Sequence, residues 1–114
     1  MSEALHMWLQ QASAKPGVLA CGVRCADRSI IARSNHEKLP ILRIQQALRE
    51  LAEAVHALQH NHLATERLRW KFEAGKVCCS AKPDGTMAAL VVSKETEDLT
   101  ECEALLADFL NLEL

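Results

Sequence analysis

The sequence predicts an α+β fold in which helices cover the faces of a five-stranded antiparallel sheet, in the order α-β-β-α-β-β-β-α. Two segments carry most of this prediction. Residues 41–58, "ILRIQQALRELAEAVHAL", place apolar residues at alternating steps of three and four, as a helix does. Residues 67–73, "RLRWKFE", alternate apolar and charged residues, as a half-buried strand does. The 114 residues suit one domain that spans 1–114.

The chain begins with a predicted helix and a hairpin. Residues 3–14 carry apolar side chains on one helical face, at Leu5, Trp8, Leu9 and Ala12. Pro16-Gly17 ends this helix. The next segment, "VLACGVRC" (18–25), is rich in small and β-branched residues. We expect "IIARS" (30–34) to return antiparallel to it after a turn at "ADRS".

The long central helix, predicted from Pro40 to about His60, has an unusually wide apolar face. Its apolar positions form one arc of roughly 160°, wider than the roughly 100° that a helix needs to lie on a core. They are Ile41, Ile44, Ala47, Leu48, Leu51, Ala52, Ala54, Val55 and Leu58. The surplus predicts contact with a second copy of the helix, which the small Ala47 and Ala54 would allow to approach closely. Alternatively, the arc covers a wide, twisted sheet.

The last third of the chain predicts a three-stranded meander and a final helix. Ala74-Gly75 is expected to form a tight turn in which Gly75 is free to take a positive φ. Pro83-Asp84-Gly85-Thr86 predicts a second turn, between strands at 76–82 and 87–94. Within 97–112 the apolar residues recur at helical spacing, at Leu99, Cys102, Leu106, Phe109 and Leu110.

Composition argues against several classes of partner. Thirteen basic and fifteen acidic residues give a net charge of -2, and the basic residues are scattered, whereas phosphate-backbone binding normally needs a basic face. No stretch approaches the roughly 18 apolar residues of a membrane helix, and the N-terminus lacks the pattern of a signal peptide. We therefore expect a cytoplasmic protein with no nucleic-acid and no membrane partner.

The sequence predicts no enzyme, no cofactor and no metal site. The cysteines show no C-x-x-C spacing, and we interpret them as buried thiols in a reducing compartment: Cys21, Cys25, Cys78, Cys79 and Cys102. His56 and His60 lie one helical turn apart, but both fall outside the apolar arc and no further ligand completes a tetrahedral site. Glycine-rich phosphate loops are absent from the sequence.

Three segments, "PGVLACGVRCADRSIIARS", "FEAGKVCCSAKPDGTMAALVVSK" and "LLADFLNL", together with the element order, resemble the Roadblock/LC7 family over nearly the whole chain. The resemblance implies a profilin-like sheet, no catalytic residues, and dimers formed through the central helix and third strand, here 39–60 and 67–73. It also implies binding of a small Ras-like GTPase as a regulator or scaffold, or service as a dynein light chain or similar assembly subunit. One departure is Asp27-Arg28, where the family's first hairpin often carries Asp-Gly, so the turn type stays open.

The sequence and the resemblance together predict a homodimeric adaptor that regulates or scaffolds a small GTPase. The predicted interface residues are Ala47, Leu51, Ala54, Leu58, Arg69 and Lys71. A mixed-charge surface on the same helix would bind the partner or would simply be a solvated face; its residues are Arg43, Gln46, Arg49, Glu50 and Glu53. Two other functions stay open: a small-ligand sensor of the PAS or profilin-like type, with a pocket between sheet and helices, and a dimeric chaperone for an exported protein.

Overall fold

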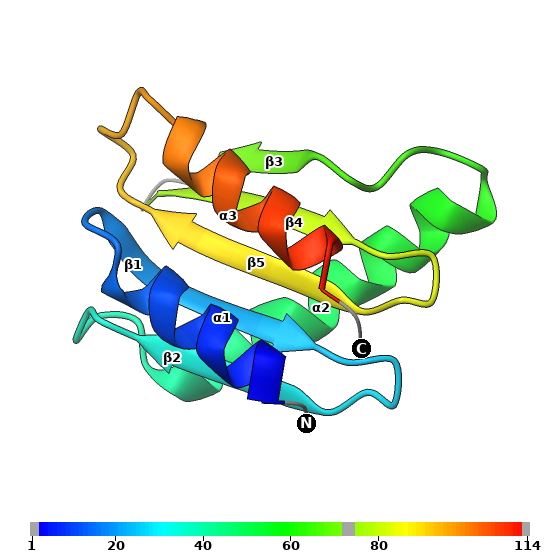
Figure 1. Cartoon of the computed structure of the whole chain (residues 1–114), viewed down its shortest axis with the longest axis horizontal. Helices are drawn as coiled ribbons and strands as arrows, with labels where there is room; N and C mark the ends of the chain where they lie inside the picture. Colours follow the sequence, from blue (N-terminus) through cyan, green and yellow to red (C-terminus); the bar gives the residue numbers. More distant parts are fainter. Residues whose placement is uncertain (1–2, 72–74, 113–114) are drawn as a thin grey trace.

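A computed structural model describes residues 3–71 and 75–112 and confirms the predicted fold class and element order (Figure 1). The helices are α1 (Glu3–Ala14), α2 (Ile41–His60) and α3 (Thr100–Leu110). The strands are β1 (Val18–Arg24), β2 (Ile30–Ser34), β3 (Leu68–Lys71), β4 (Lys76–Ala81) and β5 (Met87–Val92). Phe72 and Glu73 of the predicted third strand, and Ala74 of the predicted turn, lie outside the described residues.

The five strands form one antiparallel sheet in the order β2-β1-β5-β4-β3. The first hairpin joins the meander where β1 pairs with β5, with Cys21 opposite Leu90. β3 pairs with β4, Leu68 opposite Cys79, and lies at the edge of the sheet. An edge strand keeps backbone N–H and C=O groups that face away from its neighbour, so β3 is open to further pairing.

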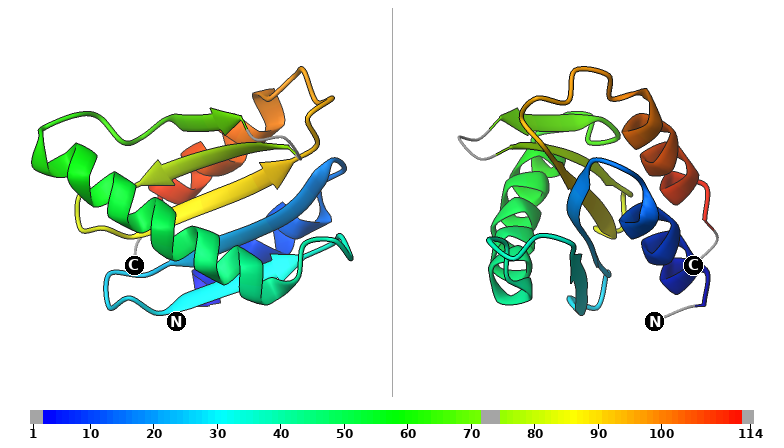
Figure 2. Two further views of the ribbon diagram at one scale, coloured as in Figure 1. Left: turned by 180° about the vertical axis from the view of Figure 1, so that it is seen from behind. Right: turned by 90° about the vertical axis from the view of Figure 1, so that its left-hand side faces the viewer.

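Helices α1 and α3 lie on one face of the sheet and α2 lies on the other (Figure 2). Strands β1, β4 and β5 are therefore buried on both faces, which explains why they carry nearly continuous apolar residues rather than an alternating pattern. Trp8 of α1 holds the two-helix face together. Its ring lies 5.4 Å from that of Phe109, and its Nε1 donates a 2.7 Å hydrogen bond to the Leu105 carbonyl of α3.

Small residues on the other face of the sheet allow α2 to approach the strands closely. Ala20 and Ala89 belong to this face, and Gly22 lies between Ala20 and the strand end. A β-carbon at Gly22 would lie 2.4 Å from Cδ1 of Leu48, so the leucine occupies the space that a side chain would need. Helix α2 consequently packs on β1 and β2, where Leu48 is fully buried.

Gly75, which the predicted turn left free to take a positive φ, does not take one. Among the described glycines, positive φ occurs at Gly17 (84°) and Gly85 (93°), the second of which the turn at Pro83-Asp84-Gly85-Thr86 predicted. A β-carbon at Gly75 would lie 2.5 Å from the Val92 carbonyl oxygen. Glycine is therefore needed there because the backbone entering β4 passes close to the end of β5, not because of an unusual φ.

Replacing Gly75 with alanine should destabilise the protein by about 2 kcal/mol, since a backbone carbonyl of the sheet must move to admit the new methyl group. The matched control is Gly17→Ala, where the nearest atom is 3.9 Å away and the left-handed φ alone costs about 1 kcal/mol. Urea unfolding of both variants measures the difference. A Gly75→Ala variant no less stable than Gly17→Ala would contradict this account.

Candidate functional site

Helix α2 presents different surfaces on its two flanks. One flank carries the shoulder of the apolar arc, where Ala47 and Ala54 are exposed and Leu51 and Leu58 are half-buried. The centre of the arc is buried against the sheet through Ile44, Leu48 and Val55. The predicted arc is wide because it combines core positions with positions that the protein leaves uncovered.

The uncovered shoulder continues onto the sheet. Leu68 and Trp70 of β3 face the same side as α2 and are half-buried. Because α2 packs on β1 and β2, no helix among the described residues covers β3 on this face (Figure 2). We call this surface the open apolar strip, which consists of Ala47, Leu51, Ala54, Leu58, Leu68 and Trp70.

The two predicted interface residues of β3 lie elsewhere. Side chains alternate along a strand, so Arg69 and Lys71 point to the opposite face from Trp70. Arg69 forms an ion pair with Glu103 of α3, and Lys71 is exposed. The structure thus places four of the six predicted interface residues on the open apolar strip and two on the face of α1 and α3.

The predicted partner-binding residues of α2 are all exposed, but they divide into two groups. By helical phase Arg43 and Glu50 lie beside the open apolar strip, and Gln46 follows them on the outward face of α2. Arg49 and Glu53 line a pocket on the other side of that outward face. Sequence reasoning had joined these two groups into one surface.

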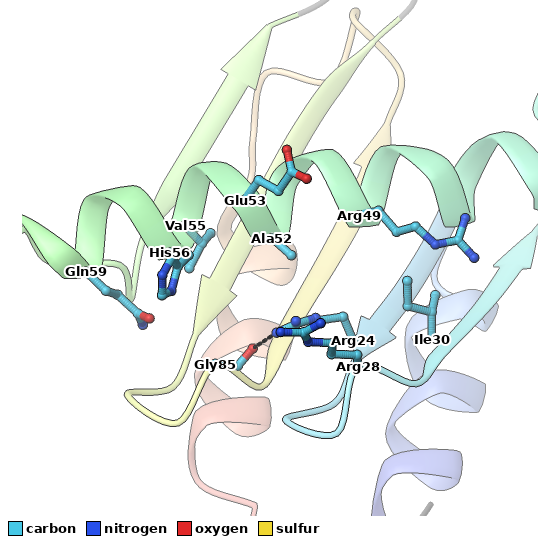
Figure 3. A pocket seen from close by; sticks show the side chains of 10 residues that line it. All are labelled: Arg24, Arg28, Ile30, Arg49, Ala52, Glu53, Val55, His56, Gln59 and Gly85. Carbon is cyan, nitrogen blue, oxygen red and sulfur yellow. Dashed lines mark hydrogen bonds between the residues drawn. The ribbon is translucent and has the colours of Figure 1, made fainter.

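The pocket has a volume of about 540 Å³ and lies between α2, the β1–β2 turn and the β4–β5 turn (Figure 3). Arg24 enters it from the end of β1, because the alternation along this strand gives Arg24 the same side as Gly22. Its Nη1 donates a 3.3 Å hydrogen bond to the Gly85 carbonyl, which ties the two turns together. His56 and Gln59 of α2 complete the polar part of the lining.

Arg28 enters the pocket from a turn whose conformation usually selects glycine. The Cys25 carbonyl accepts a 2.9 Å hydrogen bond from the Arg28 N–H, and the Ser29 carbonyl accepts one of 2.8 Å from the Cys25 N–H. Arg28 has a φ of 73°, the left-handed position in which the family's Asp-Gly would put glycine. Asp27 stabilises the turn by accepting hydrogen bonds from the Ser29 N–H and Oγ, which lower the pKa of its carboxyl group.

Sequence reasoning missed Arg24 and Arg28 as site residues. A signal existed at Arg24, where a charged residue follows the small Ala20 and Gly22 on the side of the strand that α2 covers. For Arg28 the signal is an arginine at a turn position where the family often carries glycine. Neither signal shows that two turns and a helix bring these side chains to one pocket.

Comparison with known proteins gives a match in structure but not in sequence. No protein-family model matches this sequence, and a search of curated proteins finds no match either. Among solved structures, a Roadblock/LC7 domain from Streptomyces avermitilis superimposes with a TM-score of 0.65, over 90% of this chain and 89% of that domain, at 11% sequence identity. The chain has a Roadblock/LC7-like fold. The fold implied by the sequence resemblance is thereby confirmed.

Four of the five cysteines in this Roadblock/LC7-like fold lack the surroundings of a catalytic nucleophile. Burial raises the pKa of Cys21 to about 11 and that of Cys79 to about 12. Burial also raises the pKa of Cys78 and Cys102, while Cys25 is half-buried, and all five thiols are free. A nucleophilic cysteine needs the opposite shift, because the thiolate is the reactive form.

Two further classes of site receive no support from the described residues. Within 3–71 and 75–112, no three His, Cys, Asp or Glu side chains are grouped closely enough to hold a metal ion. His56 and His60 are both exposed, and His56 faces the pocket. In the same part of the chain, no helix is both long and apolar enough to cross a membrane.

The buried thiols predict a loss of stability at high pH. Below pH 9.0 a cysteine is protonated in both the folded and the unfolded chain, so the stabilisation from burying a neutral thiol is fully present. From pH 9 to about 12 the unfolded chain releases the Cys79 proton while the folded chain retains it. The free energy of unfolding should therefore fall by about 1.4 kcal/mol per pH unit from this group alone.

Cys79→Ala should be less stable than the wild type at pH 7 but should show a shallower decline by about that amount per pH unit. Urea unfolding between pH 8 and pH 11 measures both slopes, and the remaining titrating groups are the same in the two proteins. Parallel curves for wild type and variant would refute the raised pKa of Cys79.

Proposed function

We propose that this protein is a non-catalytic homodimeric adaptor that binds a small Ras-like GTPase in the cytoplasm and regulates or scaffolds it. The observation that carries the proposal is the open apolar strip, which lies beside the edge strand β3 in a Roadblock/LC7-like fold. The fold match supports protein–protein interaction in general. The dimer and the GTPase are inferred from the strip and from the sequence resemblance.

A second copy of the chain is the occupant that suits the strip best. Half-exposed Leu51 and Trp70 gain free energy when they leave water, at about 25 cal/mol for each Å² of apolar area buried. Ala47 and Ala54 are a heptad apart and small, so two α2 helices can approach closely. A two-fold axis would bring two strips together and two β3 edges within reach of each other, which satisfies the apolar surface and the open backbone groups at once.

A partner platform follows from such a dimer. Arg43 and Glu50 lie beside the open apolar strip, Gln46 follows them on the outward face, and all three are exposed, so the two-fold axis would join two such sets into one continuous surface. Mixed charge around an apolar interface is typical of a polar rim, which contributes more to partner selection than to affinity. The surface would act by binding, in keeping with the raised pKa of four of the five cysteines.

Ala54→Glu should separate the dimer without unfolding the protomer. Ala54 is exposed in the single chain, so the glutamate is solvated there, whereas in the dimer it would be buried without a partner. The isologous interface carries the change twice, so dimerisation should weaken by about 3 kcal/mol or more. Sedimentation equilibrium measures the dimer constant, and circular dichroism checks the fold.

The matched control is Ala104→Glu, at an exposed alanine of α3 on the opposite face of the sheet. This variant should dimerise like the wild type. A wild-type protein that is monomeric at high concentration, or an Ala54→Glu protein that dimerises normally, would overturn the proposed interface.

Glu50→Lys should weaken capture of the GTPase about tenfold while the dimer stays intact, since the change reverses one charge of the proposed platform. The experiment retains partners on the tagged protein, with GDP or with a non-hydrolysable GTP analogue, and identifies them by mass spectrometry. Glu97→Lys is the control, an exposed charge reversal outside α2. Capture of a nucleotide-dependent Ras-like GTPase by wild type and Glu97→Lys supports the proposal. Recovery of a secreted protein, or of a sibling fold alone, argues against it.

A further inference from the structure

The pocket beside α2 concentrates positive charge in a chain that is negative as a whole. The chain has a net charge of -2, yet Arg24, Arg28 and Arg49 all line this pocket. Glu53 is the acidic residue of the lining, and in Figure 3 its carboxylate points away from Arg24 and Arg28. Three arginines against this one glutamate leave a local charge of about +2.

No carboxylate of the described residues forms an ion pair with any of the three arginines. The ion pair formed within 3–71 and 75–112 joins Arg69 to Glu103, on the other face of the sheet. Arg49 and Glu53 are one helical turn apart, a spacing that often supports an ion pair, but they do not form one. In Figure 3 Arg24 and Arg28 lie beside each other, and Arg49 extends along α2 away from them. Like charges that line one pocket without ion pairs repel one another, and a bound anion reduces that repulsion.

We propose that this pocket binds a small organic phosphate. The guanidinium group is planar and donates two parallel hydrogen bonds to phosphate oxygens. A phosphate monoester carries about −1.5 to −2 charges at neutral pH, which matches the local excess, whereas a single carboxylate leaves part of it uncompensated. The volume of 540 Å³ is in the range of small-molecule sites, and Ile30, Ala52 and Val55 provide an apolar wall for the organic part of the ligand.

Arg24 is held in place before any ligand arrives, and the exposed Arg28 projects from a defined turn. Arg24 is fixed by its hydrogen bond to the Gly85 carbonyl, which uses one of its five N–H donors. Arg28 stands in a turn closed by two backbone hydrogen bonds, at a left-handed φ that glycine adopts without strain. The turn alone would favour glycine at position 28. The presence of arginine there is explained if its guanidinium group binds a ligand.

The phosphate site does not depend on the proposed dimer. The pocket and the open apolar strip lie on opposite flanks of α2, so pairing of two strips leaves the pocket mouth open. The phosphate site can therefore be tested whether or not the proposed adaptor function holds.

The test titrates the full chain with inorganic phosphate and with pyrophosphate, against chloride and acetate at equal ionic strength. Backbone amide NMR shifts report the site, and Arg28 and Gly85 should respond together. Arg28→Gly should weaken pyrophosphate binding about tenfold or more, and it removes the strain at φ 73° instead of adding any. Arg49→Gln, on the surface of α2, should show a similar loss without depending on the turn.

The matched control is Arg33→Gln, an exposed arginine of β2 outside the pocket, which should bind like the wild type. Equal weakening in Arg33→Gln would mean attraction to overall charge and would overturn the site. Phosphate that binds no better than chloride would do the same. Acetate as effective as phosphate would replace the phosphate ligand by a carboxylate, such as an acidic side chain of a protein partner.

Discussion

The contact of Leu48 with Gly22 determines where α2 lies, and both candidate surfaces depend on that position. The fully buried Leu48 fills the space above Gly22, which has no side chain. The small side chains of Ala20 and Ala89 let the helix approach the neighbouring part of the sheet. The helix therefore makes its closest contacts with β1 and β2, and farther along it Val55 shares a core cluster with residues of β4 and β5. A seat nearer to β3 would cover the open apolar strip and would widen the distance between α2 and Arg24.

The widths of the layers explain why one face of the sheet remains partly open. Five strands spaced about 4.8 Å apart span about 19 Å, and a helix with its side chains is about 10 Å wide. Two helices, α1 and α3, match the width of one face, and Trp8 joins them through Phe109 and the Leu105 carbonyl. One helix covers only about half of the other face. Leu68 and Trp70 are therefore only half-buried, and this is the face on which we propose that a second copy of the chain binds.

The two proposals assign different tasks to the two flanks of one helix. The flank of Ala47 and Ala54 is small and apolar and suits another copy of the chain. The flank of Arg49 meets two turns that contribute Arg24 and Arg28, and it suits an anion. Because both flanks belong to a single rigid element, a ligand that repositions α2 at the pocket would also act on the strip. The proposed small-molecule site would then lie within reach of the proposed protein interface.

The sequence by itself determined the element order, the fold class, the turn at Gly85 and the surplus apolar shoulder of the long helix. These features depend on side-chain periodicities of two or of 3.6 residues and on the residues that form turns. Both act between residues close together in the chain, so they can be recognised in the sequence. Sequence reasoning also separated Ala47 and Ala54 from the core positions of the same arc, because helical phase alone distinguishes them.

The contacts between these helices and strands could be read only from the tertiary structure. The close approach at Gly75, the ion pair of Arg69 with Glu103, and the gathering of Arg24, Arg28 and Arg49 all join segments far apart in the chain. No local sequence pattern predicts such contacts, because they depend on the angle and offset at which a helix packs on a twisted sheet. That offset depends on where small and large residues of different elements fit together, which is why the helix was predictable and its neighbours were not.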